Sequence, residues 1–456
     1  MTDFSYLLAG VMFIVGLKRL GSPRTARSGN LVASVGMALA LVVTLVDQDI
    51  TAWGTVIAGI IVGTVIGAVL ALRVQMTGMP ELVAAFNGFG GIASALVAAA
   101  ELRRVGGADL PVDTAIAVAV SIVVGAVTFT GSFVAFAKLR GLVSGRPVTY
   151  RSQQIVNGTL FGVLVGVIVW ATATDEPAAF WLAGALALVI GVLGVIPIGG
   201  ADMPVVISLL NSYSGLAAAA AGFVIANNAL IIGGALVGSA GFILTSLMTK
   251  AMNRSLANVL FAGFGTADST GTGTLDRDDR QVKAATADDV AIALGYAESV
   301  VMVPGYGLAV AQAQHVTHRL ASELAERGVR VRYAIHPVAG RMPGHMNVLL
   351  AEADVSYELM ADLDEINSEF ARTDVVLVLG ANDVVNPSAR DDPSSPIHGM
   401  PVLDVDHART VVVVKRSLSP GFAGIDNPLF YMDGTLMYFD DARKALDDVL
   451  AALDEI

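Results

Sequence analysis

The sequence contains no cysteine, and only 15% of its 456 residues are charged. The absence of cysteine excludes disulfides, thiolate catalysis and cysteine-based metal sites, and no other motif predicts a metal. With 54% hydrophobic residues and a mean hydropathy of +0.67, so few charges predict several transmembrane helices rather than a soluble protein. The net charge of −12 comes mostly from the C-terminal third, which argues against binding to nucleic acid.

Histidine is missing from the apolar part of the chain, because all six histidines lie between His315 and His407. A flavin-linked membrane reductase would need histidines in its helices to ligate haem. The sequence therefore disfavours that class.

Apolar runs of spanning length recur through the first 250 residues and predict about nine transmembrane helices, rich in Gly and Ala as close helix packing in lipid requires. They lie near residues 4–20, 30–46, 53–72, 81–100, 114–137, 155–172, 180–197, 204–226 and 229–249. Lys and Arg concentrate in alternate loops, although Arg103 and Arg104 lie against the pattern. The positive-inside rule then places the N-terminus outside and the C-terminal domain in the cytoplasm.

Few polar side chains interrupt these runs, and the candidates are Asn87, Ser132 and Asn211. Such groups either line a proton path with water or form hydrogen bonds between helices. Asp202, two residues before Pro204, also has two interpretations: a coupling group, or the N-cap of the helix that follows.

The composition changes after the last apolar run. We predict a transmembrane domain at 1–250, a mobile polar linker at 251–288 and a nucleotide-binding domain at 289–456. In this last part strand-like and helical runs alternate, which predicts a Rossmann-like, doubly wound parallel sheet. The predicted strands are 299–303, 329–335, 355–359, 374–379, 401–405 and 410–414, and the predicted helices are 309–327, a stretch after His345, 364–370 and 442–453.

Gly305-Tyr306-Gly307 follows the first of these strands and opens a segment that we expect to form a helix of about five turns. Glycine turns in this position bring backbone N–H groups close to a pyrophosphate. Val310 replaces the third glycine of the usual pattern, so the motif alone also fits a structural strand-to-helix turn.

The second strand of the domain leads into His336 with no carboxylate to hold a ribose 2′-hydroxyl, which favours NADP over NAD. Lys415-Arg416-Ser417 follows a later strand and supplies the cations and hydroxyl that suit a phosphate dianion, unless it is a solvated basic pair. Residues 419–424 then predict a lid loop with glycine hinges.

Asp383 lies at the carboxyl end of another buried strand, where it is either functional or a turn-forming residue. His345 is either a proton-active group near the site or a helix-start residue.

Several longer segments of the sequence closely resemble the β subunit of the proton-translocating NAD(P) transhydrogenases. The matching strings, which cover essentially the whole chain, are Met79–Val83, Gly199–Val205, Leu210–Gly215, Lys250–Ser255, Val303–Gly307, His336–Ala351, Gly380–Val384, Lys415–Leu418 and Asp426–Pro428.

The resemblance implies a membrane enzyme that couples direct hydride transfer between NAD(H) and NADP(H) to proton translocation. NADP(H) would bind this chain, and NAD(H) would bind one or two α subunits with further membrane helices, in a dimer of such units in the bacterial inner membrane. Together with Gly305 and Gly307, the implied cofactor contacts are Tyr306, Val338, Ala339, Gly340, Arg341, Met342, Pro343, Gly380, Ala381, Asn382, Asp383, Val384, Gly399, Met400, Lys415, Arg416, Ser417, Leu418, Ser419, Pro420, Gly421, Phe422, Asp441 and Ala442.

No side chain is expected to act as a chemical catalyst, since hydride transfer needs two nicotinamides held together away from water. Asp383 is our candidate coupling residue. Many family members have His where this chain has Asn87, and Asn cannot carry a proton. We therefore expect Asn87, Ser132 and Asn211, with Asp202, to line a water path whose histidine comes from the partner. The alternative function is a transporter or channel gated by a cytoplasmic nucleotide-binding domain.

Overall fold

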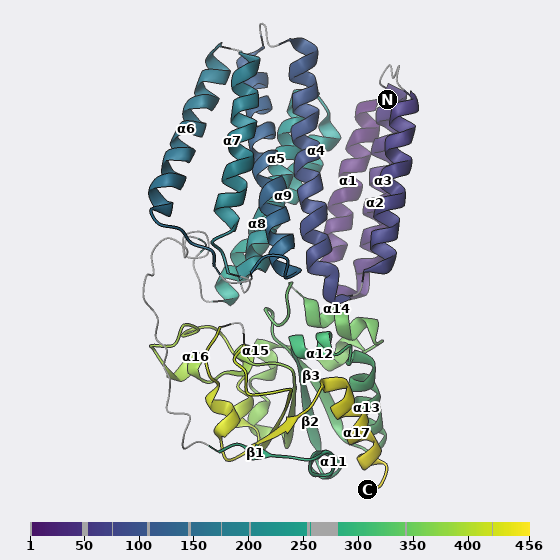
Figure 1. The fold of residues 1–456 in the computed structure, drawn as a ribbon. Coiled ribbons are helices and arrows are strands. Elements are labelled where there is room, and N and C mark those ends of the chain that lie inside the picture. The colour runs from purple at the N-terminus through teal and green to yellow at the C-terminus, as the bar shows by residue number, and fades with distance from the viewer. Residues whose placement is uncertain are drawn as a thin grey trace. The chain divides into compact units, whose positions relative to one another are not determined.

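The computed structural model describes residues 2–47, 53–74, 76–106, 110–144, 147–174, 176–199, 202–252, 256, 281–342, 344–421 and 423–456. The chain forms two compact units, a helical one that extends from Met1 to Ser246 and a second that contains the C-terminal residues to Ile456. Figure 1 shows the helices of the first unit and the sheet of the second. Most of the predicted linker, 257–280, lies outside the described residues, so its boundaries stay a prediction.

Each of the nine predicted apolar segments forms a helix in the described part of the chain. They are α1 (Thr2–Leu20), α2 (Pro23–Asp47), α3 (Trp53–Arg73), α4 (Met79–Val105), α5 (Val112–Leu139), α6 (Gln153–Thr174), α7 (Pro177–Val195), α8 (Met203–Val224) and α9 (Asn228–Ala251). Eight of these, α2 to α9, are long and apolar enough to cross a membrane by length and composition. The prediction of a polytopic helical bundle is therefore confirmed.

Small residues allow the central helices to approach closely. A Cβ on Gly91 of α4 would lie 2.9 Å from the carbonyl oxygen of Gly125 in α5, so neither helix leaves room for a side chain at the crossing. α8 and α9 meet in the same way, where a Cβ on Gly215 would lie 2.7 Å from the Cα of Gly238. The backbone contact that lipid-embedded helices need is thus supplied by glycine.

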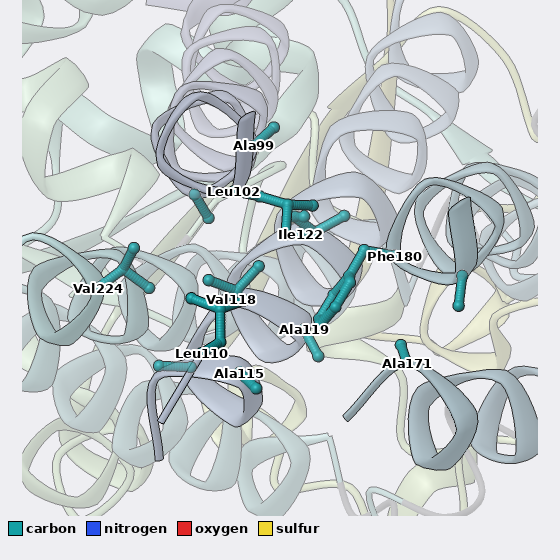
Figure 2. Close-up of a cluster of buried hydrophobic side chains, with 13 residues drawn as sticks. Ala99, Leu102, Leu110, Ala115, Val118, Ala119, Ile122, Ala171, Phe180 and Val224 are labelled. Atoms are coloured by element: carbon teal, nitrogen blue, oxygen red, sulfur yellow. The ribbon is translucent and has the colours of Figure 1, made fainter. Parts of the chain in front are cut away.

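A cluster of buried apolar side chains joins α4 to α8 around α5 (Figure 2). Phe180 of α7 is fully buried there, and Leu102 of α4 and Val118 of α5 are similarly enclosed. Removing a buried phenylalanine side chain from such a site costs about 3–5 kcal/mol in soluble proteins. This cluster holds α5 in the middle of the unit.

The C-terminal unit contains a seven-stranded sheet in which every pair of neighbouring strands is parallel. Its strands are β1 (Lys283–Ala284), β2 (Ser299–Pro304), β3 (Arg330–Ile335), β4 (Met360–Asp362), β5 (Val375–Leu379), β6 (Thr410–Lys415) and β7 (Thr435–Phe439), in the order β1-β7-β6-β5-β2-β3-β4. β2 to β7 thus have the strand order of a dinucleotide-binding fold, with the switch point between β2 and β5. The predicted Rossmann-like sheet is confirmed.

Helices cover both faces of this sheet. They are α11 (Ala287–Gly295), α12 (Tyr306–Val310), α13 (Gln314–Glu326), α14 (His345–Glu352), α15 (Leu363–Ile366), α16 (Ser388–Asp391) and α17 (Ala442–Leu453). α17 packs against α11 and α13, while α15 and α16 lie on the other side of the sheet (Figure 1). β2 and β5 are entirely buried between these layers, which explains their unbroken β-branched and aliphatic composition.

Several local predictions were wrong. The expected five-turn helix after the glycine turn is broken, because Gln312 takes a left-handed conformation at φ +53° and separates α12 from α13. The predicted strand 355–359 holds a 3-10 turn at Tyr357–Leu359, and β4 follows it. Residues 401–405 form a loop rather than a strand, and β1 and β7 were not predicted.

Candidate functional site

The glycine turn after β2 lies against the glycine turn after β5, at the switch point of the sheet. The Gly305 N–H donates to the carbonyl of Leu379 at 2.9 Å, and the Gly307 N–H donates to that of Gly380 at 2.9 Å. A Cβ on Gly305 would lie 2.5 Å from the backbone nitrogen of Ala381. Gly380 is left-handed at φ +66°, and a Cβ on it would lie 2.7 Å from the carbonyl carbon of Gly307. Only glycine fits here, because the backbones of the two turns approach too closely for a side chain.

The loop after β3 reaches back to this turn. The guanidinium carbon of Arg341 lies 4.3 Å from the ring centre of Tyr306, a cation–π contact that joins the two loops. Gly340 has φ +102°, and a Cβ on it would lie 2.8 Å from the Cγ atom of His345. Of the predicted loop residues, Arg341 is therefore packed beside the first turn.

A buried histidine connects this loop to the segment that follows α16. His336 Nδ1 accepts the Val338 N–H at 3.2 Å, and its Nε2 lies 2.7 Å from the carbonyl oxygen of Pro401. Gly399 and Met400 directly precede Pro401 in the chain. The structure thus links two segments that the family resemblance assigns to one site.

The predicted phosphate-binding residues Lys415, Arg416 and Ser417 begin where β6 ends. Lys415 donates to the carbonyl of Ser419 at 2.8 Å and lies 4.8 Å from the ring centre of Phe430. Burial lowers the pKa of the Lys415 ammonium, while Asp383 and Asp426 oppose that shift through their charges. Ser417 and Ser419 share a hydroxyl hydrogen bond of 2.9 Å, which closes the loop on itself.

The predicted lid folds onto the predicted coupling residue. The Asp383 carboxylate accepts the Ala423 N–H at 2.9 Å, and a Cβ on Gly421 would lie 2.8 Å from the carboxyl carbon of Asp383. The loop after β6 is thereby held against the loop after β5. The structure brings Asp383 and residues 415–421 together as one cluster.

Arg416 lacks the ion pairs that hold Arg332 and Arg390, and within the described residues it shares this with other exposed arginines of the domain, such as Arg443. Arg332 pairs with Glu365 and Glu369, and Arg390 pairs with three aspartates. Arg416 is exposed and, within the described residues, forms neither an ion pair nor a side-chain hydrogen bond. An unpaired guanidinium at the carboxyl edge of a parallel sheet suits a phosphate group.

The remaining predicted contacts lie at the same edge or outside the described residues. Asp441 is the N-cap of α17 and accepts the Arg443 N–H at 3.1 Å, and Ala442 begins that helix, which contacts α12. Pro343 and Phe422 lie outside the described residues.

Two buried asparagines that we did not predict support the site. Asn427 donates to the carbonyl of Asn382 at 3.1 Å, and Asn386 donates to that of Asp426 at 3.0 Å. Both side chains are fully buried, so their amides fix the loop after β5 against residues 426–427. Asn427 precedes Pro428 and caps a short helix by accepting the Leu429 N–H. An Asn followed by Pro is typical of a helix N-terminus, so this pair is the sequence signal from which a capping role of Asn427 could have been predicted.

In the helical unit, Asn87 of α4 donates to the Ser132 hydroxyl of α5 at 2.9 Å, so these two predicted residues are neighbours. Asn211 lies in α8, which packs against both helices, and its neighbour Leu210 contacts Gly131. Asp202 occupies the N-cap position of α8, as the second interpretation predicts, although its side chain makes no capping hydrogen bond.

Acid should destabilise the C-terminal domain through His336. Burial lowers the pKa of this imidazole to about 4, below its ordinary value of 6.5. Between these values the unfolded chain binds more protons than the folded one, so stability is complete above pH 6.5 and is lost as pH falls toward 4. The expected loss is about 3 kcal/mol. Pulse proteolysis in urea at pH 4.5 and 7.5 would measure it, and an equal pH dependence in His336→Gln would contradict this origin.

A bundle of apolar helices followed by a parallel sheet with glycine turns at its switch point defines a class, the polytopic membrane proteins with a Rossmann-like domain. A family model described as NAD(P) transhydrogenase beta subunit matches residues 2–452. Two relatives named NAD(P) transhydrogenase subunit beta, both from Rhodospirillum rubrum and one from strain ATCC 11170, are 48% identical over 441 residues, which is 95% of each chain. This chain belongs to the NAD(P) transhydrogenase β-subunit family. It is therefore part of a membrane enzyme that uses nicotinamide nucleotides and has an α-subunit partner.

Proposed function

We propose that the C-terminal domain of this chain binds NADP(H), with the 2′-phosphate held by Lys415, Arg416 and Ser417. The position of exposed Arg416 at the carboxyl edge of the sheet, where no described residue pairs with it, is the observation that carries this proposal. In a NAD-binding fold the second strand of the dinucleotide-binding order usually ends in a carboxylate that holds the ribose 2′-hydroxyl. Here that strand is β3, and it leads into buried His336, so no carboxylate at that position would select a ribose hydroxyl. The glycine turns at 305–307 and 380–381 would then face the pyrophosphate.

Hydride transfer would occur between this NADP(H) and NAD(H) on the α subunit. The protein's contribution is to hold the two nicotinamides in contact and to keep water away, because proximity supplies most of the acceleration in such a reaction. The loop at 415–422 would close over the nucleotide. Asp383, our candidate coupling residue, would link the position of this loop to proton movement in the helical unit. Family membership disfavours the alternative of a transporter that carries out no redox chemistry.

The helical unit would conduct protons along Asn87, Ser132 and Asn211, with Asp202 near one end of the path. Asn87 has no titratable proton, so we propose that a histidine of the α subunit completes the path. Coupling requires a shift of a few kcal/mol between open and closed nucleotide sites. The complex would be a dimer of α–β units in the bacterial inner membrane, with the N-terminus outside and the nucleotide domain in the cytoplasm.

Reconstitution with the α subunit tests this function. Vesicles that contain both subunits should transfer hydride from NADH to NADP+ only when protons can move, so an uncoupler should change the rate. The β chain alone should bind NADP(H) without turnover. Nucleotide binding without hydride transfer in the complete complex would support the transporter instead.

Replacing Asn87 by leucine should abolish proton movement in these vesicles while NADP(H) binding stays within about threefold of the parent. Leucine removes the amide that donates to Ser132 and fills the space that water would need. A dye-quenching assay for proton uptake, run beside a binding titration, measures both. Intact pumping in Asn87→Leu would contradict the proposed path, and the control is Ser34→Leu in α2, where the hydroxyl donates to Asn30 of its own helix.

A further inference from the structure

Two histidines lie at the ends of the loop between β3 and α14, and both point their Nδ1 atoms at backbone N–H groups of that loop. His336 accepts from Val338, and His345 Nδ1 accepts from Arg341 at 3.0 Å. His345 is only 1% exposed. An imidazole that accepts at Nδ1 and is neutral carries its proton at Nε2.

The bond to Arg341 has consequences beyond the loop. It fixes the backbone of the residue whose guanidinium lies over Tyr306, and Tyr306 belongs to the turn after β2. The rings of Tyr306 and His345 are also near one another, with centroids 6.3 Å apart. His345 therefore sets the position of Arg341 relative to the first glycine turn.

We propose that His345 is a positioning residue for nucleotide binding: its neutral ring, acting as an acceptor at Nδ1, holds the loop at 338–341 in the shape that receives NADP(H). This role rests on the proposed function of the domain. Within the described residues, Nε2 of His345 has no hydrogen-bond partner. The hydrogen bond from the Arg341 N–H to Nδ1 is therefore the polar contact through which this ring holds the loop.

The geometry separates two isosteric substitutions. Asparagine places its amide oxygen where Nδ1 lies, whereas glutamine places its amide where Nε2 lies. His345→Asn should therefore keep the acceptor for the Arg341 N–H, and His345→Gln should lose it. Both variants bury an amide of moderate size, so a difference between them reports the acceptor rather than a loss of packing.

The first measurement is the dissociation constant of NADP+ for the full-length chain in detergent. We expect His345→Asn to stay within about threefold of the parent and His345→Gln and His345→Ala to bind about tenfold more weakly, the effect of one buried hydrogen bond. His407→Ala, a change at an exposed histidine of the same domain, should leave binding unchanged.

Acid provides a second readout. Burial first, and then the charge of Arg341, lower the pKa of His345, and Tyr306 is the other titratable group that faces it. Because the pKa is lowered, the parent should lose NADP+ affinity only at pH values below the ordinary range of histidine, whereas His345→Asn should lose less. Hydrogen exchange of residues 338–342 without nucleotide should be faster in His345→Gln than in His345→Asn.

These outcomes separate the two proposals. A parent chain that fails to bind NADP+ would overturn the proposed function. A parent that binds, with Asn and Gln variants equal in affinity and in hydrogen exchange, would overturn the positioning role of His345 alone.

Discussion

Replacing Arg416 by alanine is expected to weaken NADPH binding about 10- to 100-fold while leaving the fold intact. A hydrogen bond to a charged group contributes about 1.5–3 kcal/mol, and a guanidinium can make two to one phosphate. Because Arg416 is exposed and bonded to no described side chain, its loss should cost the domain little stability. Lys415 is a less clean target, since it also holds Ser419 and packs on Phe430.

The matched control is Arg409→Ala. Arg409 directly precedes β6, whereas Arg416 directly follows it, so the two arginines flank opposite ends of one strand. Arg409 is 82% exposed and pairs only weakly with Asp374. Calorimetric titration with NADPH and with NADH should show the Arg416 effect on NADPH alone and none for Arg409. An equal loss for both nucleotides would contradict a 2′-phosphate contact.

Replacing Gly380 by alanine is expected to destabilise the C-terminal domain by about 2–5 kcal/mol and to abolish nucleotide binding. A non-glycine residue at φ +66° costs about 1–2 kcal/mol. The added Cβ would also overlap the backbone of Gly307, and overpacking of this kind costs about 1–3 kcal/mol. Pulse proteolysis in urea measures the change in unfolding free energy.

Gly328→Ala separates the two causes. Gly328 is also left-handed, at φ +87°, but a Cβ there would meet no atom of the described residues within 4 Å. It should cost only the conformational part, about 1–2 kcal/mol, and should leave NADPH affinity unchanged. Equal losses for Gly380→Ala and Gly328→Ala would show that the close approach of the two turns is unimportant.

The sequence predicts most of the architecture where one physical signal dominates. Long apolar runs require helices in lipid, and the short, β-branched runs at 299–303 and 410–414 predict buried strands. Residues 401–405 are also rich in aliphatic side chains, and we predicted a strand there. Instead of pairing with a neighbouring strand, the backbones of Val402 and Asp404 form hydrogen bonds with the side chain of Asn367. The break at Gln312 is invisible because no glycine or proline marks it.

The candidate site is predictable in its segments but not in its connections. The turn at 305–307 and the trio at 415–417 are local motifs, so spacing reveals them. The bonds from Asn427 to Asn382 and from His336 to Pro401 join residues 45 and 65 positions apart. Such pairs depend on the order of strands in the sheet, which a single sequence does not contain.

Binding of nucleotides to the full-length chain without its partner tests the central claim most directly. Titration of the purified chain with NADPH and with NADH should give an affinity for NADPH at least about 100-fold higher, because only NADPH carries the phosphate that Arg416 and Lys415 would hold. Equal affinities, or a preference for NADH, would contradict the assignment of NADP(H) to this chain.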